Sequence, residues 1–124
     1  MNNDKSLLII DDDSTNIFAL SAILKAKKFH CLAAASAAEG FDLLKKEDHN
    51  IGIVLMDMMM PEMDGYEAMA AMREDREMSA IPVIAVTAQA MDGDKQKCME
   101  SGASGYVSKP IDIDELIRLI NRLK

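Results

Sequence analysis

The apolar run Ile51-Gly52-Ile53-Val54-Leu55-Met56, which ends directly at Asp57, decides the fold class. Similar short apolar runs occur at four other places in the chain: Leu7–Ile10, Cys31–Ala35, Ile81–Val86 and Tyr106–Val107. Three of these runs are continuously apolar rather than alternating, which is typical of strands buried on both faces of a parallel sheet. The pattern therefore predicts five short strands, most of them buried.

Segments of helical length lie between these runs, and several begin with a residue that can cap a helix. The expected capping residues are Ser14, Ser36, Asp64 and Asp112. In the last three cases a glutamate follows three residues later, which is the spacing of a capping box: Glu39, Glu67 and Glu115. Gly102 is expected to end the helix that contains residues 95–101.

Strands and helices thus alternate along the whole chain, which predicts an α/β fold with a parallel sheet, right-handed crossovers and helices on both faces. Five strands and five helices favour the flavodoxin-like, doubly wound arrangement with strand order 2-1-3-4-5. The chain has 124 residues, the size of one domain, so we expect a single domain over residues 1–124.

Composition narrows the possible environments and partners. The formal net charge of −7 and the absence of a basic tract argue against binding to nucleic acid or anionic lipid. No apolar run approaches the ~20 residues of a membrane span, and residues 1–5 do not resemble a signal peptide. Cys31 and Cys98 lack the CxxC spacing, so we expect free thiols and a cytoplasmic location.

Polar residues collect where four of the apolar runs end: Asp11, Asp12 and Asp13, then Asp57, Thr87 and Lys109. The carboxyl ends of parallel strands lie at one edge of the sheet, and ligands bind there at the switch point between strands one and three. We therefore expect Asp11, Asp12 and Asp57 to converge in one crevice, with Thr87 and Lys109 along its other wall. Asp13 is expected to have a capping or surface role.

Converging carboxylates repel each other, by about 3 kcal/mol for a pair at ~5 Å and an effective dielectric near 20. A cation is the natural compensation, and a partly filled all-oxygen site suits Mg²⁺. Asp57 could then act as a nucleophile toward phosphorus and form an aspartyl phosphate. Lys109 and the Thr87 hydroxyl would bind the phosphoryl oxygens as charge develops on them.

Four motifs carry a family resemblance, and together they span nearly the whole chain: residues 8–13 (Leu-Ile-Ile-Asp-Asp-Asp), 54–65 (Val-Leu-Met-Asp-Met-Met-Met-Pro-Glu-Met-Asp-Gly), 86–88 (Val-Thr-Ala) and 102–110 (Gly-Ala-Ser-Gly-Tyr-Val-Ser-Lys-Pro). In this order and spacing they resemble the CheY-like receiver domain of response regulators in two-component signalling. The resemblance implies a phosphorelay protein that takes its phosphoryl group from a histidine kinase or a histidine phosphotransfer protein. Such a domain is not a turnover enzyme, and it would be a monomer or a weak homodimer.

The resemblance also implies roles for the acidic residues. Asp57 matches the phosphoacceptor and Asp12 the direct ligand of Mg²⁺. Asp11 matches the ligand that usually acts through water, and the backbone carbonyl of Met59 matches the remaining protein ligand.

Switch residues follow from the same resemblance. Thr87 matches the switch hydroxyl, Tyr106 the switch aromatic, and Lys109 the phosphate-binding cation, with a cis peptide bond expected between Lys109 and Pro110. Phosphorylation is expected to draw Thr87 toward the phosphoryl group, to let Tyr106 turn inward, and so to change the surface formed by the fourth helix, fifth strand and fifth helix.

Three alternatives remain open at this stage. Residues 11–15 (Asp-Asp-Asp-Ser-Thr) fit the DxDxT motif of haloacid-dehalogenase-like phosphatases, with Asp11 as nucleophile and Asp13 as general acid/base, although Asp57 would then have no function. A flavin-binding module of the same topology would place three aspartates against a phosphate. The third is a degenerate receiver that only docks proteins. The chain ends directly after the fifth helix, so we expect either a stand-alone regulator or a receiver excised from a longer protein.

Overall fold

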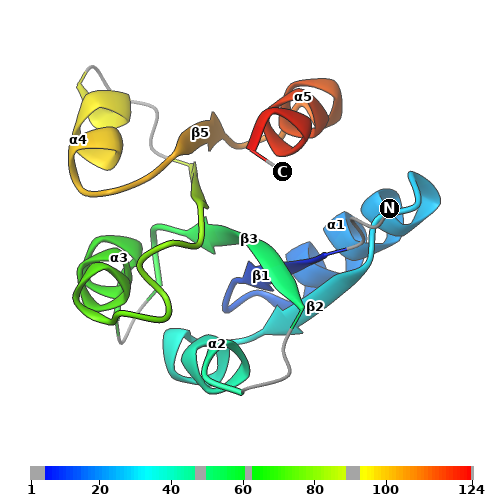
Figure 1. Cartoon of the computed structure of the whole chain (residues 1–124). Coiled ribbons are helices and arrows are strands. Elements are labelled where there is room, and N and C mark those ends of the chain that lie inside the picture. Colours follow the sequence, from blue (N-terminus) through cyan, green and yellow to red (C-terminus); the bar gives the residue numbers. More distant parts are fainter. Residues whose placement is uncertain (1–4, 47–49, 61–62, 89–92, 124) are drawn as a thin grey trace.

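A computed structural model describes residues 5–46, 50–60, 63–88 and 93–123 of the chain, and Figure 1 shows their arrangement. Strands and helices alternate as expected. The strands are β1 (Ser6–Ile10), β2 (Cys31–Ala34), β3 (Ile51–Asp57), β4 (Val83–Thr87) and β5 (Gly105–Ser108). The helices are α1 (Ser14–Ala26), α2 (Ala37–Leu44), α3 (Gly65–Glu74), α4 (Asp94–Glu100) and α5 (Ile113–Leu123).

The five strands form one parallel sheet with the order β2-β1-β3-β4-β5, which confirms the predicted topology. The strand order reverses between β1 and β3, which pair with Ile10 opposite Met56. On the other side of β3, Asp57 lies opposite Val86. The residues that follow β1 and those that end β3 and β4 are therefore neighbours at one edge of the sheet.

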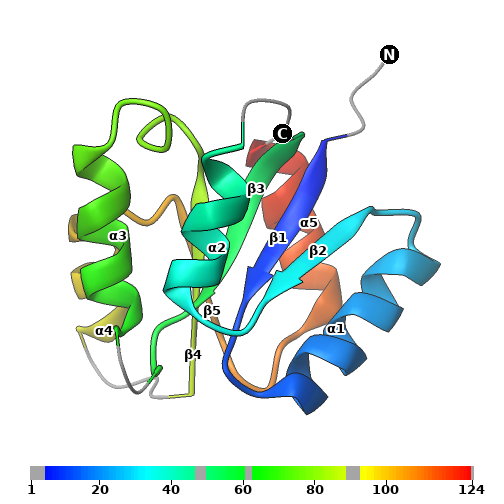
Figure 2. The same cartoon turned by 90° about the horizontal axis from the view of Figure 1, so that it is seen from below.

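Helices cover both faces of the sheet, as Figures 1 and 2 show. Side chains of the strands alternate between the two faces, so each strand contributes to two hydrophobic cores. One core packs β-strand residues such as Leu8 and Met56 against α2, α3 and α4. The other packs Ile9 and Leu55 against α1 and α5, where Leu24, Leu116 and Ile120 are buried.

The helix caps differ from the sequence prediction at one position. Asp13, not Ser14, caps α1, because its side chain accepts hydrogen bonds from the backbone N–H groups of Thr15 and Asn16. Ser14 is the first residue of the helix. The prediction of Ser14 was wrong because either residue can cap a helix, and the backbone of Asp13 is the one that is extended (φ −102°, ψ 107°).

Other predicted helix boundaries are confirmed. Asp64 and Glu67 form a reciprocal capping box at α3, and Asp112 accepts the N–H of Glu115 at α5. Ser36 caps α2, although Glu39 accepts from the N–H of Ala35 rather than from that of Ser36. Gly102 follows the end of α4 with a φ of 115°, a left-handed conformation that favours glycine.

At their carboxyl ends β3 and β4 extend one residue further than the apolar pattern predicts. Asp57 and Thr87 are themselves the last residues of β3 and β4, so their side chains are fixed by the sheet rather than by a loop. Pro61 and Glu62, which belong to the second sequence motif, lie outside the described residues. None of the helices in the described ranges combines the length and the apolar character needed to cross a bilayer.

Candidate functional site

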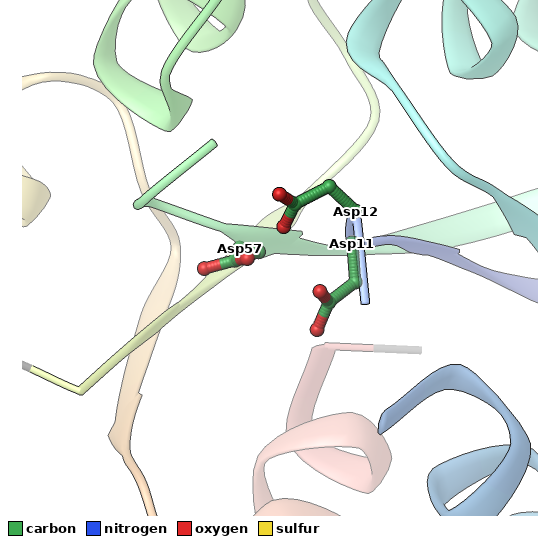
Figure 3. A group of neighbouring side chains, drawn as sticks. All are labelled: Asp11, Asp12 and Asp57. Carbon is green, nitrogen blue, oxygen red and sulfur yellow. The ribbon is translucent and has the colours of Figure 1, made fainter. Parts of the chain in front are cut away.

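Three carboxylates meet at the carboxyl edge of the sheet, as Figure 3 shows. Asp11 and Asp12 follow β1, and Asp57 ends β3. One carboxylate oxygen from each of the three residues lies within 4.8 Å of the other two. Asp11 and Asp57 are buried, whereas Asp12 is exposed, so the cluster is open to solvent on one side. The predicted convergence of these three residues is confirmed.

Lys109 faces the same cluster from the end of β5. Its ammonium nitrogen lies 3.7 Å from Oδ2 of Asp11 and 4.0 Å from Oδ1 of Asp57. One positive charge beside three carboxylates leaves an excess of negative charge in a partly buried place. Hard oxygen ligands with uncompensated negative charge are the donor set that Mg²⁺ prefers, so the residues present fit such an ion.

Backbone N–H groups orient two of the three carboxylates. The N–H of Asp13 donates to Oδ1 of Asp11 at 2.9 Å, and the N–H of Met59 donates to Oδ1 of Asp57 at 3.1 Å. Each donor lies two residues beyond its acceptor, in the segment that follows the strand. Each is the local hydrogen bond that an aspartate side chain commonly forms with the backbone two residues further on, and neither was among the contacts predicted from the sequence.

The environment of Asp57 disfavours its charged form. Burial raises the pKa of this carboxyl above its usual range, and the negative charge of Asp11 raises it further. The hydrogen bond from Met59 and the charge of Lys109 act in the opposite direction without cancelling the effect of burial. A cation in the site would therefore favour the ionised form of Asp57.

Thr87 ends β4 and Lys109 directly follows β5, and both strands lie on the side of β3 away from β1. Thr87 is buried at the end of β4, and its carbonyl oxygen accepts the backbone N–H of Lys109 at 2.8 Å. That bond links the ends of β4 and β5. The Lys109–Pro110 peptide bond is cis, as the resemblance implied.

Tyr106 lies within β5, opposite Ala85 of β4. Its half-buried ring packs against the core beneath α3 and α4. It also lines a cavity of about 290 Å³ together with Lys95 and Met99 of α4 and Arg118 of α5. Tyr106 therefore connects β5 to α4 and α5, the helices whose surface is expected to change on phosphorylation. It is not one of the residues of the acidic cluster.

An apolar cavity beside the site had no counterpart in the sequence analysis. It has a volume of about 320 Å³ and reaches from Asp57 and Lys109 to the side chains of α1 and of the segment before α5. Leu20 and Ile23 line it on α1, and Ile111 lines it on the opposite side. These residues come from distant parts of the chain, so only the packing of α1 beside α5 brings them together.

The structure gives Asp13 a structural role. Its side chain caps α1, and its backbone orients Asp11. The phosphatase interpretation needs this carboxyl as a general acid/base and leaves Asp57 unused. The geometry instead brings Asp57 into one cluster with Asp11 and Asp12.

Comparison with known proteins agrees with this geometry. The family model described as the response regulator receiver domain matches residues 7–121. Among curated proteins, the polar-differentiation response regulator DivK of Brucella ovis is 34% identical over 116 residues, which cover 94% of this chain and 93% of DivK.

Two solved receiver structures illustrate the similarity of the fold. The receiver domain of the sensor histidine kinase PA1611 from Pseudomonas aeruginosa has a magnesium ion coordinated in its active-site cleft; it is 26% identical, with a TM-score of 0.84 and 98% of both chains covered. A response regulator receiver domain protein from Clostridium thermocellum is 26% identical, with a TM-score of 0.86 and coverage of 96% of this chain and 93% of that one. With an acidic cluster at the expected edge of this fold, the chain belongs to the response regulator receiver family, whose members are phosphoaccepting signalling domains rather than turnover enzymes.

Proposed function

We propose that Asp57 is the phosphoacceptor of this receiver and that residues 1–124 act as one receiver domain. The donor is a phosphohistidine on a histidine kinase or on a histidine phosphotransfer protein. A carboxylate oxygen of Asp57 attacks phosphorus, the P–N bond breaks, and the imidazole of the donor leaves. The observation that carries the proposal is the meeting of three carboxylates, one of which belongs to the buried strand-end Asp57, whose Oδ1 lies 4.0 Å from the ammonium nitrogen of Lys109.

Mg²⁺ is the metal that we propose for this site. Asp11, Asp12 and Asp57 would hold it, with the backbone carbonyl of Met59 as a further ligand. When bound, the ion would supply positive charge beside the nucleophile and beside the oxygens of the incoming phosphoryl group. Two observations support the choice: the oxygen-only donor set, and the magnesium ion recorded in the cleft of the PA1611 receiver.

The remaining site residues would stabilise the phosphoryl group once it has been transferred. Lys109 binds one of its oxygens through a charge-assisted contact, and the Thr87 hydroxyl binds another. Movement of Thr87 toward the phosphoryl group then shifts the end of β4, and Tyr106 on β5 responds. The linked ends of β4 and β5 support this coupling, because Lys109 donates its backbone N–H to Thr87.

The decisive experiment is phosphorylation by acetyl phosphate, followed by intact mass, with and without Mg²⁺. The wild type should gain one phosphoryl group only when Mg²⁺ is present, and Asp57→Asn should gain none. Asp11→Asn serves as the comparison variant. If the protein were a phosphatase with Asp11 as nucleophile, Asp11→Asn would lose turnover, whereas Asp57→Asn would still be labelled. A folded wild type that takes up no phosphoryl group under these conditions would instead be a docking module.

A further inference from the structure

The main chain of Met58 lies between the proposed nucleophile and the proposed carbonyl ligand. Its N–H donates to the carbonyl of Val86 on β4 at 2.9 Å, and its own carbonyl accepts the N–H of Gly65 at 3.3 Å. Its side chain is buried in the core beneath α3. Met58 is therefore held by β4 on one side and by the first residue of α3 on the other.

Gly65 approaches Met58 more closely than any other residue type could. A Cβ atom at Gly65 would lie closest to Sδ of Met58, 2.7 Å from its Cα and 3.0 Å from its Cε. Non-bonded carbon atoms normally stay about 3.5–4.0 Å apart. Rotation of the Met58 side chain could relieve the contacts with Sδ and Cε, but it could not move Cα, so an added Cβ must displace main chain.

The backbone conformation of Gly65 does not itself require glycine. The residue begins α3, and the positive φ angles among the described glycines belong to Gly93 and Gly102. Alanine is favoured over glycine inside helices by about 1 kcal/mol. The close approach to Met58 is therefore the structural feature that favours glycine at this position.

The peptide groups next to Met58 determine the geometry of the site. On one side Met58 is joined to Asp57. On the other it is joined to Met59, whose N–H orients Oδ1 of Asp57 at 3.1 Å. A displacement of Met58 would therefore change the direction of this N–H group and of the Met59 carbonyl together.

We propose that Gly65 is a positioning residue for the acidic site: by letting α3 lie directly against the main chain of Met58, it fixes the Met59 peptide groups relative to Asp57. The part of this inference that concerns Mg²⁺ rests on the proposed function. The part that concerns the Met59 N–H group is independent of it, and the experiment separates the two.

The test compares Gly65→Ala with Ala68→Gly, which changes a buried residue of the same helix without adding atoms near Met58. We expect Gly65→Ala to shift the Met59 amide resonance of the metal-free protein and to weaken Mg²⁺ binding, measured by calorimetry, by about tenfold or more. Ala68→Gly should lower stability but bind Mg²⁺ within about twofold of wild type. An unmoved Met59 amide in Gly65→Ala would overturn the proposal, and so would unchanged Mg²⁺ affinity in a protein whose wild type binds the ion.

A double variant distinguishes main-chain from side-chain crowding. Gly65→Ala should weaken Mg²⁺ binding by the same factor whether or not the long side chain of Met58 is present. The ratio of Mg²⁺ affinities between Met58→Ala/Gly65→Ala and Met58→Ala should therefore equal the ratio between Gly65→Ala and wild type. Recovery in the double variant would show that the long side chain of Met58 was the obstacle, and would overturn the proposal. Should Gly65→Ala not fold, the wild type still tests the coupling: Mg²⁺ should slow hydrogen exchange of the Gly65 amide, and no change would count against it.

The same data distinguish this inference from the proposed function. Failure of the wild type to bind Mg²⁺ contradicts the proposed function, and the Met59 amide shift in the metal-free variant still tests the role of Gly65. Normal binding in both wild type and Gly65→Ala contradicts the role of Gly65 alone.

Discussion

The ammonium nitrogen of Lys109 lies 4.0 Å from Oδ1 of Asp57, the same oxygen that accepts the N–H of Met59. Two positively polarised groups, one after β3 and one at the end of β5, therefore act on a single carboxylate oxygen. This arrangement fixes the orientation of the proposed nucleophile before any phosphoryl group arrives. It also partly offsets the repulsion from Asp11, which lies within reach of the same lysine.

Replacement of Lys109 by alanine should slow phosphorylation strongly, because it removes the one side-chain cation that contacts the cluster among the described residues. Loss of a single donor to a developing oxyanion lowers rates by about 10²–10³-fold. We expect a decrease of this size in the initial rate of labelling by acetyl phosphate at saturating Mg²⁺. Lys27→Ala, an equal change of charge at the far end of α1, is the control, and equal rates in both variants would contradict the role of Lys109.

The metal-free protein should become less stable as pH rises through the titration of Asp57. Its pKa is raised in the folded state, chiefly by burial, so between the ordinary carboxyl pKa of 3.8 and the higher folded value the folded protein binds more protons than the unfolded one. Stability therefore decreases with rising pH in this window. The side chain of Asp57→Asn does not ionise, so this variant does not lose stability in this way. Its unfolding free energy relative to wild type should therefore rise as pH increases across the window.

Urea unfolding in chelator at a series of pH values measures this difference. Asp42→Asn, at an exposed position on α2, controls for the removal of one negative charge. An advantage of Asp57→Asn that stays constant from acidic to neutral pH would refute the prediction. Added Mg²⁺ should stabilise the wild type, by about 2.7 kcal/mol at a hundredfold excess over the dissociation constant, and should stabilise Asp57→Asn less.

Arg73 should contribute to stability by joining two turns. Its guanidinium donates to the carbonyls of Ser79 and Ile81 before β4, and to the carbonyl of Gly102 before β5. Hydrogen bonds that involve a charged group contribute about 1.5–3 kcal/mol each, less where they are exposed. We expect Arg73→Ala to lower the unfolding free energy by about 1–3 kcal/mol in urea titrations.

Lysine should not replace this residue, because it lacks the planar fork that reaches several carbonyls at once. Arg76→Ala, at an exposed position in the following turn, should change stability by no more than about 0.5 kcal/mol. Full stability in Arg73→Lys would show that charge alone suffices.

Phe18 should contact the phosphohistidine donor. Its side chain is 77% exposed on α1, the helix that borders the site and the neighbouring apolar cavity. Aromatic residues are enriched at interfaces, and the minority of interface residues that carry most of the binding energy cost more than about 1 kcal/mol when truncated. We expect Phe18→Ala to slow transfer from a phosphohistidine protein about tenfold while labelling by acetyl phosphate, which needs no docking surface, stays unchanged.

Leu32→Ala is the control for Phe18, because Leu32 is also an exposed apolar residue, 41% accessible, but lies on the edge strand β2. It should leave both reactions unchanged. Equal slowing of both reactions in Phe18→Ala would indicate a folding defect, and no slowing of protein-dependent transfer would contradict a docking role for α1.

The sequence alone predicted the alternating fold, the strand order and the meeting of Asp11, Asp12 and Asp57, because buried parallel strands have a distinct apolar pattern and their carboxyl ends must share one edge. It could not decide between Asp13 and Ser14 as the cap of α1, since either side chain can accept the N–H bonds and only the backbone conformation selects one. The closeness of Gly65 to Met58 and the three carbonyls bound by Arg73 were decided by the tertiary structure. In each of these contacts at least one partner is a backbone atom, and backbone atoms are chemically alike at nearly every residue, so the partner is determined only when the chain is packed.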